Sequence, residues 1–358
     1  MTHSEFWVGL IAFLLFFPIV IFGPLFGVMA DRVDRQRAAI IVLIVSALLT
    51  VSLAILQLTS LLTITSLCLY AAATGLVTSA YSPLRMAMIA SLVSRAELPS
   101  AVATGAIIFN LSRLTGPALA GLIISTYGVG YALFTGALMI IPMTIILGKV
   151  TFHPSSTTSV SQNGFRSLVD GFGYVSRSSK LIGYLILSAV ISLFGRGILE
   201  LFPAFADGVY DKGSTGLAIL TASAGVGAIF AGLVLSIFRA EKIIRAALGT
   251  LGILIVLFGM TTRFDIAVLL ISLIGFCITI CGVGTQTMVQ LLVTDDYRGR
   301  VMSIWGVMGF GGTALGGLLI GVISTWVSLS NATLLSGIAC IVATAIFFFV
   351  YKDQYNER

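Results

Sequence analysis

Residues 6–37 read FWVGLIAFLLFFPIVIFGPLFGVMADRVDRQR, a long apolar run followed directly by a short charged segment. At a rise of 1.5 Å per residue, the apolar part, 6–29, is long enough to cross the roughly 30 Å of hydrocarbon in a bilayer. The charged part begins at Asp31 and carries three arginines. This pattern predicts a transmembrane helix that ends in a loop exposed to water.

The composition of the whole chain repeats this pattern. Hydrophobic residues make up 58% of the 358 residues and charged residues only 9%, whereas an ordinary soluble domain has roughly 25% charged residues. The apolar runs do not alternate with polar residues as the strands of a membrane barrel do. Glycine, of which there are 38, lets membrane helices approach each other closely. The sequence therefore predicts an all-α integral membrane protein.

Eleven apolar segments are long enough to span a membrane. They are 6–29, 38–58, 61–82, 99–125, 128–149, 180–206, 214–238, 243–261, 266–293, 300–326 and 330–351. The longest polar stretch, 152–179, is rich in Ser and Thr and is typical of a linker on the cytoplasmic side. It divides an N-terminal half of five spans, 1–151, from a C-terminal half of six spans, 180–358.

The basic residues are distributed unequally between the two sets of loops. Two residues, Lys212 and Arg263, lie on one side, and two more, Arg113 and Arg196, lie inside spans. All sixteen others lie on the opposite side: Arg32, Arg35, Arg37, Arg85, Arg95, Lys149, Arg166, Arg177, Lys180, Arg239, Lys242, Arg245, Arg298, Arg300, Lys352 and Arg358. The positive-inside rule then predicts a cytoplasmic C-terminus and, for eleven spans, an N-terminus outside the cell.

The sequence also disfavours several classes of protein. It contains no GxxxxGK[ST] phosphate loop, so we expect no ATP hydrolysis and no enzymatic activity. Cys277 and Cys281 lie one helical turn apart, but no histidine completes a metal site, so packing is the favoured role and we expect no metal or cofactor. The net charge of +6 follows the membrane topology and does not predict binding of nucleic acid.

The two halves resemble each other at an offset of 200 residues. Leu92, Val93 and Ser94 match Leu292, Val293 and Thr294, and the glycine pairs are Gly116 with Gly316 and Gly121 with Gly321. At this offset, the span 180–206 has no counterpart in the first half. We therefore expect a design of six plus six helices from which the first helix is absent. The alternative is a protein built from eleven helices.

One cytoplasmic loop carries a resemblance to a known family. The segment GVMADRVDRQR, 27–37, resembles the signature G-x-x-x-D-R-x-x-R-x-[RK] of the major facilitator superfamily. The matching residues are Gly27, Asp31, Arg32, Arg35 and Arg37, whereas Asp34 stands where the family usually has glycine. The resemblance implies two pseudo-symmetric helical halves, alternating access, and a cytoplasmic gate in which Asp31 faces the helix that begins near Arg300. The alternative is an ordinary basic loop.

Three further segments resemble the exporter subgroup of enterobactin exporters and macrolide efflux proteins. They are NLSRLTGPALAGLI at 110–123, GRGILELFPAFA at 195–206 and YRGRVMSIWGVM at 297–308. In the first segment, Gly116 and Pro117 resemble the Gly-Pro of the exporters' antiporter motif. We assign helix packing or kinking to Gly116, Pro117 and Gly121, and to the repeat partners Gly316 and Gly321.

Three ionisable residues lie at membrane depth: Arg113, Arg196 and Glu200. Each costs about 2.5–3.5 kcal/mol at the centre of a helix unless it finds a partner or an aqueous cavity. Arg196 and Glu200 lie four residues apart and are either an ion pair or a site for a proton or a cationic substrate. Arg113, one turn from Asn110, either binds an anionic substrate group or contacts backbone carbonyls beside Pro117.

These observations predict a secondary transporter, namely a proton-coupled exporter of drug-like or siderophore-like small molecules. It is expected to lie in the bacterial cytoplasmic membrane, with lipid, a small substrate and protons as partners, and to act as a monomer. Two alternatives remain open: an uptake symporter for a small solute, and a truncated membrane protein that transports nothing.

Overall fold

The protein is helical throughout the residues that its computed structural model describes, which are 4–30, 33–92, 108, 112, 115–116, 119–124, 126–150, 164–237 and 240–350. Ten helical segments in these ranges are long and apolar enough to cross a membrane. The predicted all-α membrane fold is therefore confirmed. The eleventh predicted span, 99–125, lies largely outside the described residues.

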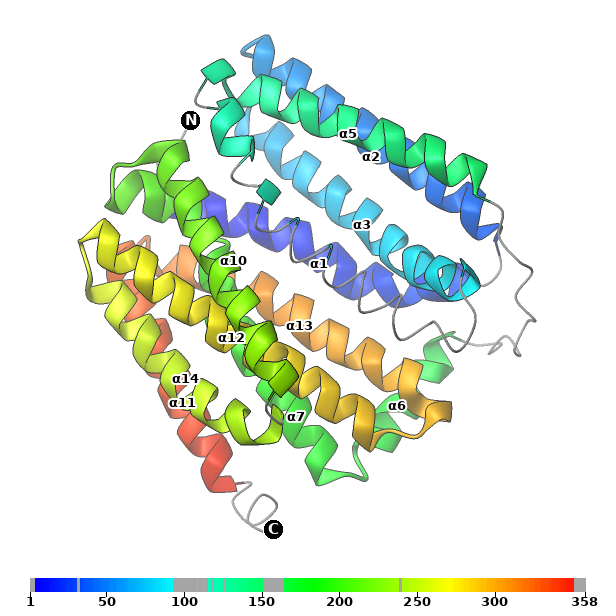
Figure 1. Cartoon of the computed structure of the whole chain (residues 1–358), viewed down its shortest axis with the longest axis vertical. Coiled ribbons are helices and arrows are strands. Elements are labelled where there is room, and N and C mark those ends of the chain that lie inside the picture. Colours follow the sequence, from blue (N-terminus) through cyan, green and yellow to red (C-terminus); the bar gives the residue numbers. More distant parts are fainter. Residues whose placement is uncertain are drawn as a thin grey trace. The chain divides into compact units, whose positions relative to one another are not determined.

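The long helices are shown in chain order in Figure 1. They are α1 Glu5–Ala30, α2 Arg35–Leu58, α3 Ile64–Leu92, α5 Val129–Lys149, α6 Gly164–Val175, α7 Ser179–Val190, α10 Gly213–Ile237, α11 Ala240–Met260, α12 Phe264–Leu292, α13 Asp295–Ile323 and α14 Leu329–Val350. Between α7 and α10 lie four short segments, η1 Ile191–Arg196, α8 Gly197–Leu199, α9 Phe202–Ala204 and η2 Phe205–Val209, of which η1 and η2 are π-helical.

Contacts divide the chain into two compact units. The N-terminal unit holds Leu14–Phe165, and the C-terminal unit holds Arg166–Arg358 together with Thr2–Phe13. The division falls inside the predicted linker, 152–179. That stretch is not irregular throughout, because Gly164–Val175 form α6 and Ser179 begins α7; the linker prediction did not anticipate this helix.

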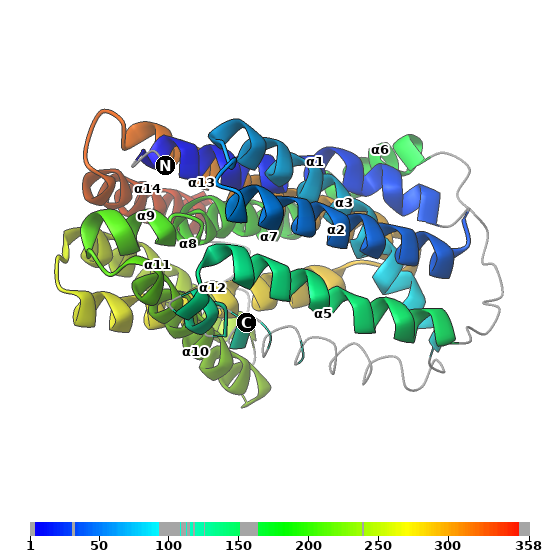
Figure 2. The same cartoon turned by 90° about the horizontal axis from the view of Figure 1, so that it is seen from above.

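In the N-terminal unit, α2 packs along both α3 and α5. Figures 1 and 2 show α2 and α5 side by side. At one end of this pair, Ala39, Leu43 and Leu147 are buried in a common cluster with Leu84 and Met88 of α3. At the same end, the Gln36 amide donates hydrogen bonds from Nε2 to the carbonyl oxygens of Leu147, at 2.7 Å, and Val150, at 3.0 Å.

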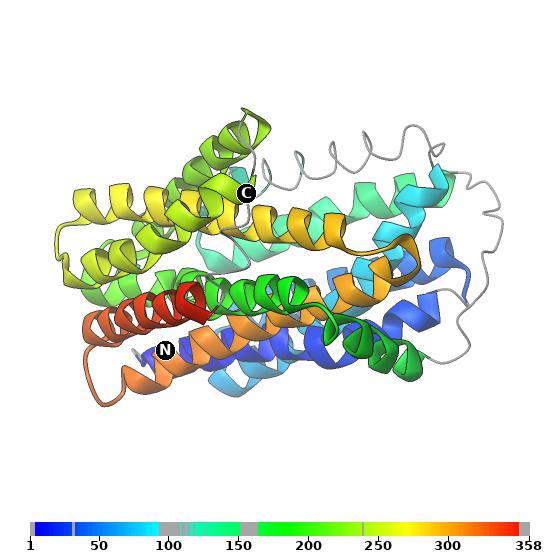
Figure 3. The ribbon, with the colours of Figure 1, turned by 90° about the horizontal axis from the view of Figure 1, so that it is seen from below.

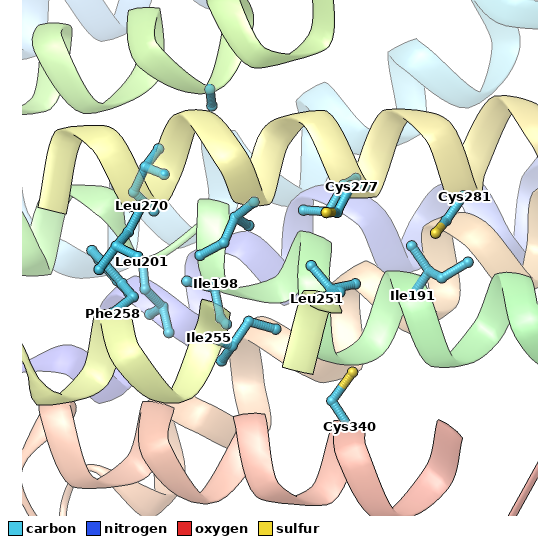
Figure 4. Packing of buried hydrophobic residues seen from close by; sticks show 14 of the residues in the cluster. Ile191, Ile198, Leu201, Leu251, Ile255, Phe258, Leu270, Cys277, Cys281 and Cys340 are labelled. Atoms are coloured by element: carbon cyan, nitrogen blue, oxygen red, sulfur yellow. The ribbon is translucent and has the colours of Figure 1, made fainter. Parts of the chain in front are cut away.

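In the C-terminal unit, buried side chains from the segment 187–210 and from α10, α11, α12 and α14 form the largest core cluster. Figure 4 shows Ile198 and Leu201 facing Ile255 and Phe258, with Cys277 and Cys281 on α12 nearby. Cys281 is fully buried and donates a weak hydrogen bond to the Ile244 carbonyl oxygen, at 3.8 Å. Both cysteines of α12 thus pack within the core.

The helix bounds preserve the repeat that the sequence predicts. α3 covers 64–92 and α12 covers 264–292, so both ends of this pair differ by 200 residues, and α5 and α14 begin at 129 and 329. The packing is also repeated, because α2 packs on α5 as α11 packs on α14. Each unit therefore contains the same kind of helix pair.

Candidate functional site

The predicted span 180–206 is interrupted in its middle. α7 runs into the π-helical η1, in which the Gly197 amide donates to the carbonyl of Ser192, five residues earlier. A second π-helical segment follows, in which Tyr210 donates to Phe205, at 3.0 Å. Pro203, which has no amide hydrogen, stands in the first turn of α9 between them. π-helical turns inside longer helices are frequent at functional sites.

Glycines of α13 bring its backbone against this interrupted span. A Cβ atom on Gly197 would lie 2.7 Å from the carbonyl carbon of Gly316, and one on Gly312 would lie 2.8 Å from the Cβ of Ser192. A Cβ on Gly316 itself would overlap the carbonyl oxygen of Leu193. No side chain fits at these positions unless the helices move apart, so the glycines hold η1 and α8 directly against α13.

Arg196 ends η1 and is half-buried. Its Nη2 atom lies 3.0 Å from the point where a Cβ on Gly282 of α12 would stand. Because Gly282 has no side chain, the guanidinium has room beside the α12 backbone. The structure thus places this cation against α12, at the depth where a charge requires a partner or water.

Glu200 is also half-buried, at the turn that follows α8. Its Cβ lies 3.6 Å from the point where a Cβ on Gly317 of α13 would stand, and the Cβ of Ala12 of α1 lies 3.5 Å from the same point. The spacing of four residues predicted one shared helix face for Arg196 and Glu200. The backbone from Arg196 through α8 to Glu200 is helical; Arg196 lies beside Gly282 of α12, and the Cβ of Glu200 lies beside Gly317 of α13.

The two sequence-matched glycines of α13 have close neighbours. A Cβ on Gly321 would lie 2.9 Å from the carbonyl oxygen of Glu5 and 3.2 Å from the Cα of Gly9, so α1 approaches α13 there. Among the described residues, no atom lies within 4 Å of a Cβ on the repeat partner Gly116, and the other partner, Gly121, is half-buried. Asn110, Arg113 and Pro117 lie outside the described residues.

The predicted gate motif is described in part. Gly27 lies in the last turn of α1, and Asp31 and Arg32 lie outside the described residues. Arg35 begins α2. Asp34, the departure from the family signature, caps this helix: its Oδ1 accepts a hydrogen bond from the Arg37 amide at 3.1 Å, and its Oδ2 lies 3.2 Å from Arg37 Nε. Carboxylates are favourable at this position because they satisfy free amides and complement the helix dipole.

Sequence reasoning missed a cluster of side chains that joins α6 to the start of α13; the two helices appear in the ribbon of Figure 3. Asp170 Oδ2 lies 3.8 Å from Arg300 Nη1, and the rings of Tyr174 and Tyr297 stack with centroids 4.4 Å apart. The guanidinium of Arg300 lies 5.0 Å from the Tyr297 ring centroid. The signal in the sequence was the spacing of Asp170 and Tyr174, which places both on one helical face.

Comparison with known proteins agrees with this architecture. The chain is 25% identical to the staphyloferrin A transporter of Staphylococcus aureus (strain NCTC 8325 / PS 47), over 98% of this chain and 89% of that protein. It is 24% identical to the enterobactin exporter EntS of Escherichia coli O1:K1 / APEC, over 100% and 86%, and 23% identical to macrolide efflux protein A of Streptococcus pyogenes, over 95% and 86%.

Solved structures share the fold at lower identity. A mutant of the nucleoside transporter NupG superposes with a TM-score of 0.72 at 14% identity, covering 97% of this chain and 91% of that one. Another structure of NupG gives 0.68 at 16% identity, covering 98% and 91%. Residues 1–357 match the family described as transmembrane secretion effectors. The chain therefore belongs to this family of the major facilitator superfamily, whose members are membrane transporters and not enzymes.

Proposed function

We propose that this secondary transporter exports siderophore-like or drug-like small molecules in exchange for protons, by alternating access, in the bacterial cytoplasmic membrane. The observation that carries the proposal is the interrupted span, which holds Arg196 and Glu200 half-buried beside glycine-lined helices. The names of the relatives, which include an enterobactin exporter and a macrolide efflux protein, support the substrate class.

Each charged side chain of the interrupted span has a role in the proposed mechanism. Glu200 carries a carboxyl group, which is able to gain and lose a proton. Arg196 is always charged and presents a planar set of donors that suits carboxylate oxygens. We assign proton exchange to Glu200 and the binding of anionic substrate groups to Arg196.

Transport by the purified, full-length protein in liposomes tests the assignment. We expect the wild type to move enterobactin or a macrolide in response to an imposed pH gradient. Glu200→Gln should abolish the response to the gradient but preserve substrate exchange, because the amide keeps the shape of the side chain and cannot carry the proton. Asp265→Asn, which changes an exposed carboxylate in the first turn of α12, is the matched control. A gradient response that survives in Glu200→Gln would contradict the assignment.

The proposal also covers the direction of transport and the orientation of the chain in the membrane. The sixteen basic residues on one set of loops support a cytoplasmic location for those loops and for the C-terminus. Accumulation of the substrate inside everted vesicles would indicate export, whereas depletion would favour the uptake symporter. Loss of transport in Asp31→Asn at normal expression would support the cytoplasmic gate, and undiminished transport would remove it.

A further inference from the structure

An apolar groove lies between α2 and α5 of the N-terminal unit, with a volume of about 360 Å³. Its walls include Ile44 and Leu48 from α2, and Phe134, Leu138 and Ile141 from α5. These five side chains are between 42% and 63% exposed, so the groove opens at the surface of the unit. Apolar side chains exposed on spanning helices are suited to contact with lipid hydrocarbon.

The groove offers no hydrogen bond to a ligand. Thr144 is the one polar residue in its wall, and its hydroxyl donates to the Ile140 carbonyl oxygen at 2.9 Å. A polar substrate held there would lose its own hydrogen bonds to water without replacement, which is unfavourable. A hydrocarbon chain meets no such penalty. The occupant of the groove is therefore apolar along this length.

One end of the groove carries positive charge. Arg37 lies on the same stripe of α2 as Ile44 and Leu48, because offsets of 7 and 11 residues return to the same helical face. Lys149 lies 11 residues after Leu138 on α5, on the same stripe by the same rule. Both cations are exposed.

The two cations are also brought to one place by the fold. Gln36, the neighbour of Arg37, donates hydrogen bonds to the carbonyls of Leu147 and Val150, which flank Lys149. Arg37 Nε lies 3.2 Å from Asp34 Oδ2, but this ion pair is exposed and therefore weak.

We propose that this groove is a binding site for one anionic phospholipid, whose acyl chain lies between α2 and α5 and whose headgroup contacts Arg37 and Lys149. From Leu138 to Lys149 the helix rises about 16 Å, which is the right scale for one acyl chain below a headgroup. A second copy of this protein is a poorer occupant, because it would bring the same two cations to the same end of the groove and the charges would repel each other.

Lipid binding to the purified full-length protein, followed by native mass spectrometry, tests the site. The probes are phosphatidylglycerol and phosphatidylcholine with identical acyl chains, so that the headgroup is the only difference. We expect one phosphatidylglycerol to bind preferentially. Loss of each cation should reduce that preference about fivefold, which corresponds to the roughly 1 kcal/mol that a basic residue contributes near an anionic lipid surface.

The double variant R37Q/K149Q should lose the headgroup preference. R177Q/K180Q removes two exposed cations from the C-terminal unit, and we expect it to bind as the wild type does. Ala47→Phe fills the groove and should weaken binding of both lipids; if this variant fails to fold, Leu138→Trp fills the groove from the α5 side.

Three results would overturn the proposal. The first is a headgroup preference that R37Q/K149Q retains, and the second is lipid binding that neither groove-filling variant weakens. The third is a dimer that the groove-filling variants dissolve, which would assign the groove to a second copy.

Discussion

Each unit contains one of two equivalent helix pairs, α2 with α5 in the N-terminal unit and α11 with α14 in the C-terminal unit. The contacts within the two pairs differ. In the C-terminal unit, glycines on both helices allow the backbones to touch. A Cβ on Gly252 would lie 3.0 Å from the backbone nitrogen of Ile341, and one on Gly259 would lie 2.9 Å from that of Leu334. In the N-terminal unit, the residue that corresponds to Gly337 is Ala137, which lies in the wall of the apolar groove.

The N-terminal pair also packs along its length, and two of its contacts lie near its ends. A Cβ on Gly130 would lie 2.6 Å from the Leu58 side chain at one end, and Gln36 bonds to the end of α5 at the other. Between these contacts the groove remains open. The two pairs therefore differ at a matched position: Gly337 allows backbone contact inside a core, whereas Ala137 lies in the wall of a groove that opens at the surface of its unit.

The largest expected effect comes from breaking the glycine contact. Gly337→Leu should destabilise the protein by about 1–3 kcal/mol or more, because a Cβ there would lie 2.8 Å from the backbone nitrogen of Val256. Thermal unfolding in detergent should show a lower Tm by several degrees. Gly136→Leu in α5 is the matched control, since nothing lies within 4 Å of its Cβ position. An equal loss of stability in both variants would contradict the comparison.

A smaller effect is expected from removing the polar contact of the N-terminal pair. Gln36→Ala deletes two hydrogen bonds to the end of α5, and we expect a loss of about 1–2 kcal/mol, measured as a lower Tm. Asn331→Ala, which changes an exposed side chain in the first turn of α14, should leave Tm unchanged. If Gln36→Ala behaves as this control does, the pair is held by its apolar contacts alone.

The smallest effect on stability is expected from the residues that cap the N-termini of α2 and α13. Asp34→Ala removes the side-chain cap of α2 and should cost about 1 kcal/mol. Thr294→Ala changes the equivalent position of α13, where the side chain makes no capping hydrogen bond, and we expect almost no change there. Hydrogen exchange of the first-turn amides of α2 measures the difference directly. Unchanged protection of these amides in Asp34→Ala would show that the cap has no energetic role.

Much of the architecture was predictable because it depends on local properties of the chain. The bounds of α3 and α12 match the repeat offset, and ten of the eleven predicted spans correspond to membrane-length helices in the described residues. The family was also predictable, since the loop at 27–37 preserves its spacing. Helix α6 was missed because its polar composition was interpreted as a linker, although Asp170 and Tyr174 share one face.

For the candidate site, the sequence predicted which residues are involved but not which residues surround them. A charged residue inside an apolar run is conspicuous, so Arg196 and Glu200 were found from the sequence. Their surroundings were not, because the residues beside them belong to other helices, α12 and α13. The neighbours that position them, Gly282 and Gly317, are 86 and 117 residues away along the chain.

By itself, the sequence determined that this protein lies in a lipid bilayer, where its membrane spans are, and the family to which it belongs. These properties follow from the free energy of transferring apolar side chains into lipid and from the spacing of motif residues. Both depend only on short stretches of the chain. Only the tertiary structure decided that α11 and α14 touch through glycine while α2 and α5 leave a groove between them. The distance between two helices depends on every side chain at their contact, and folding brings those side chains together from opposite ends of each unit.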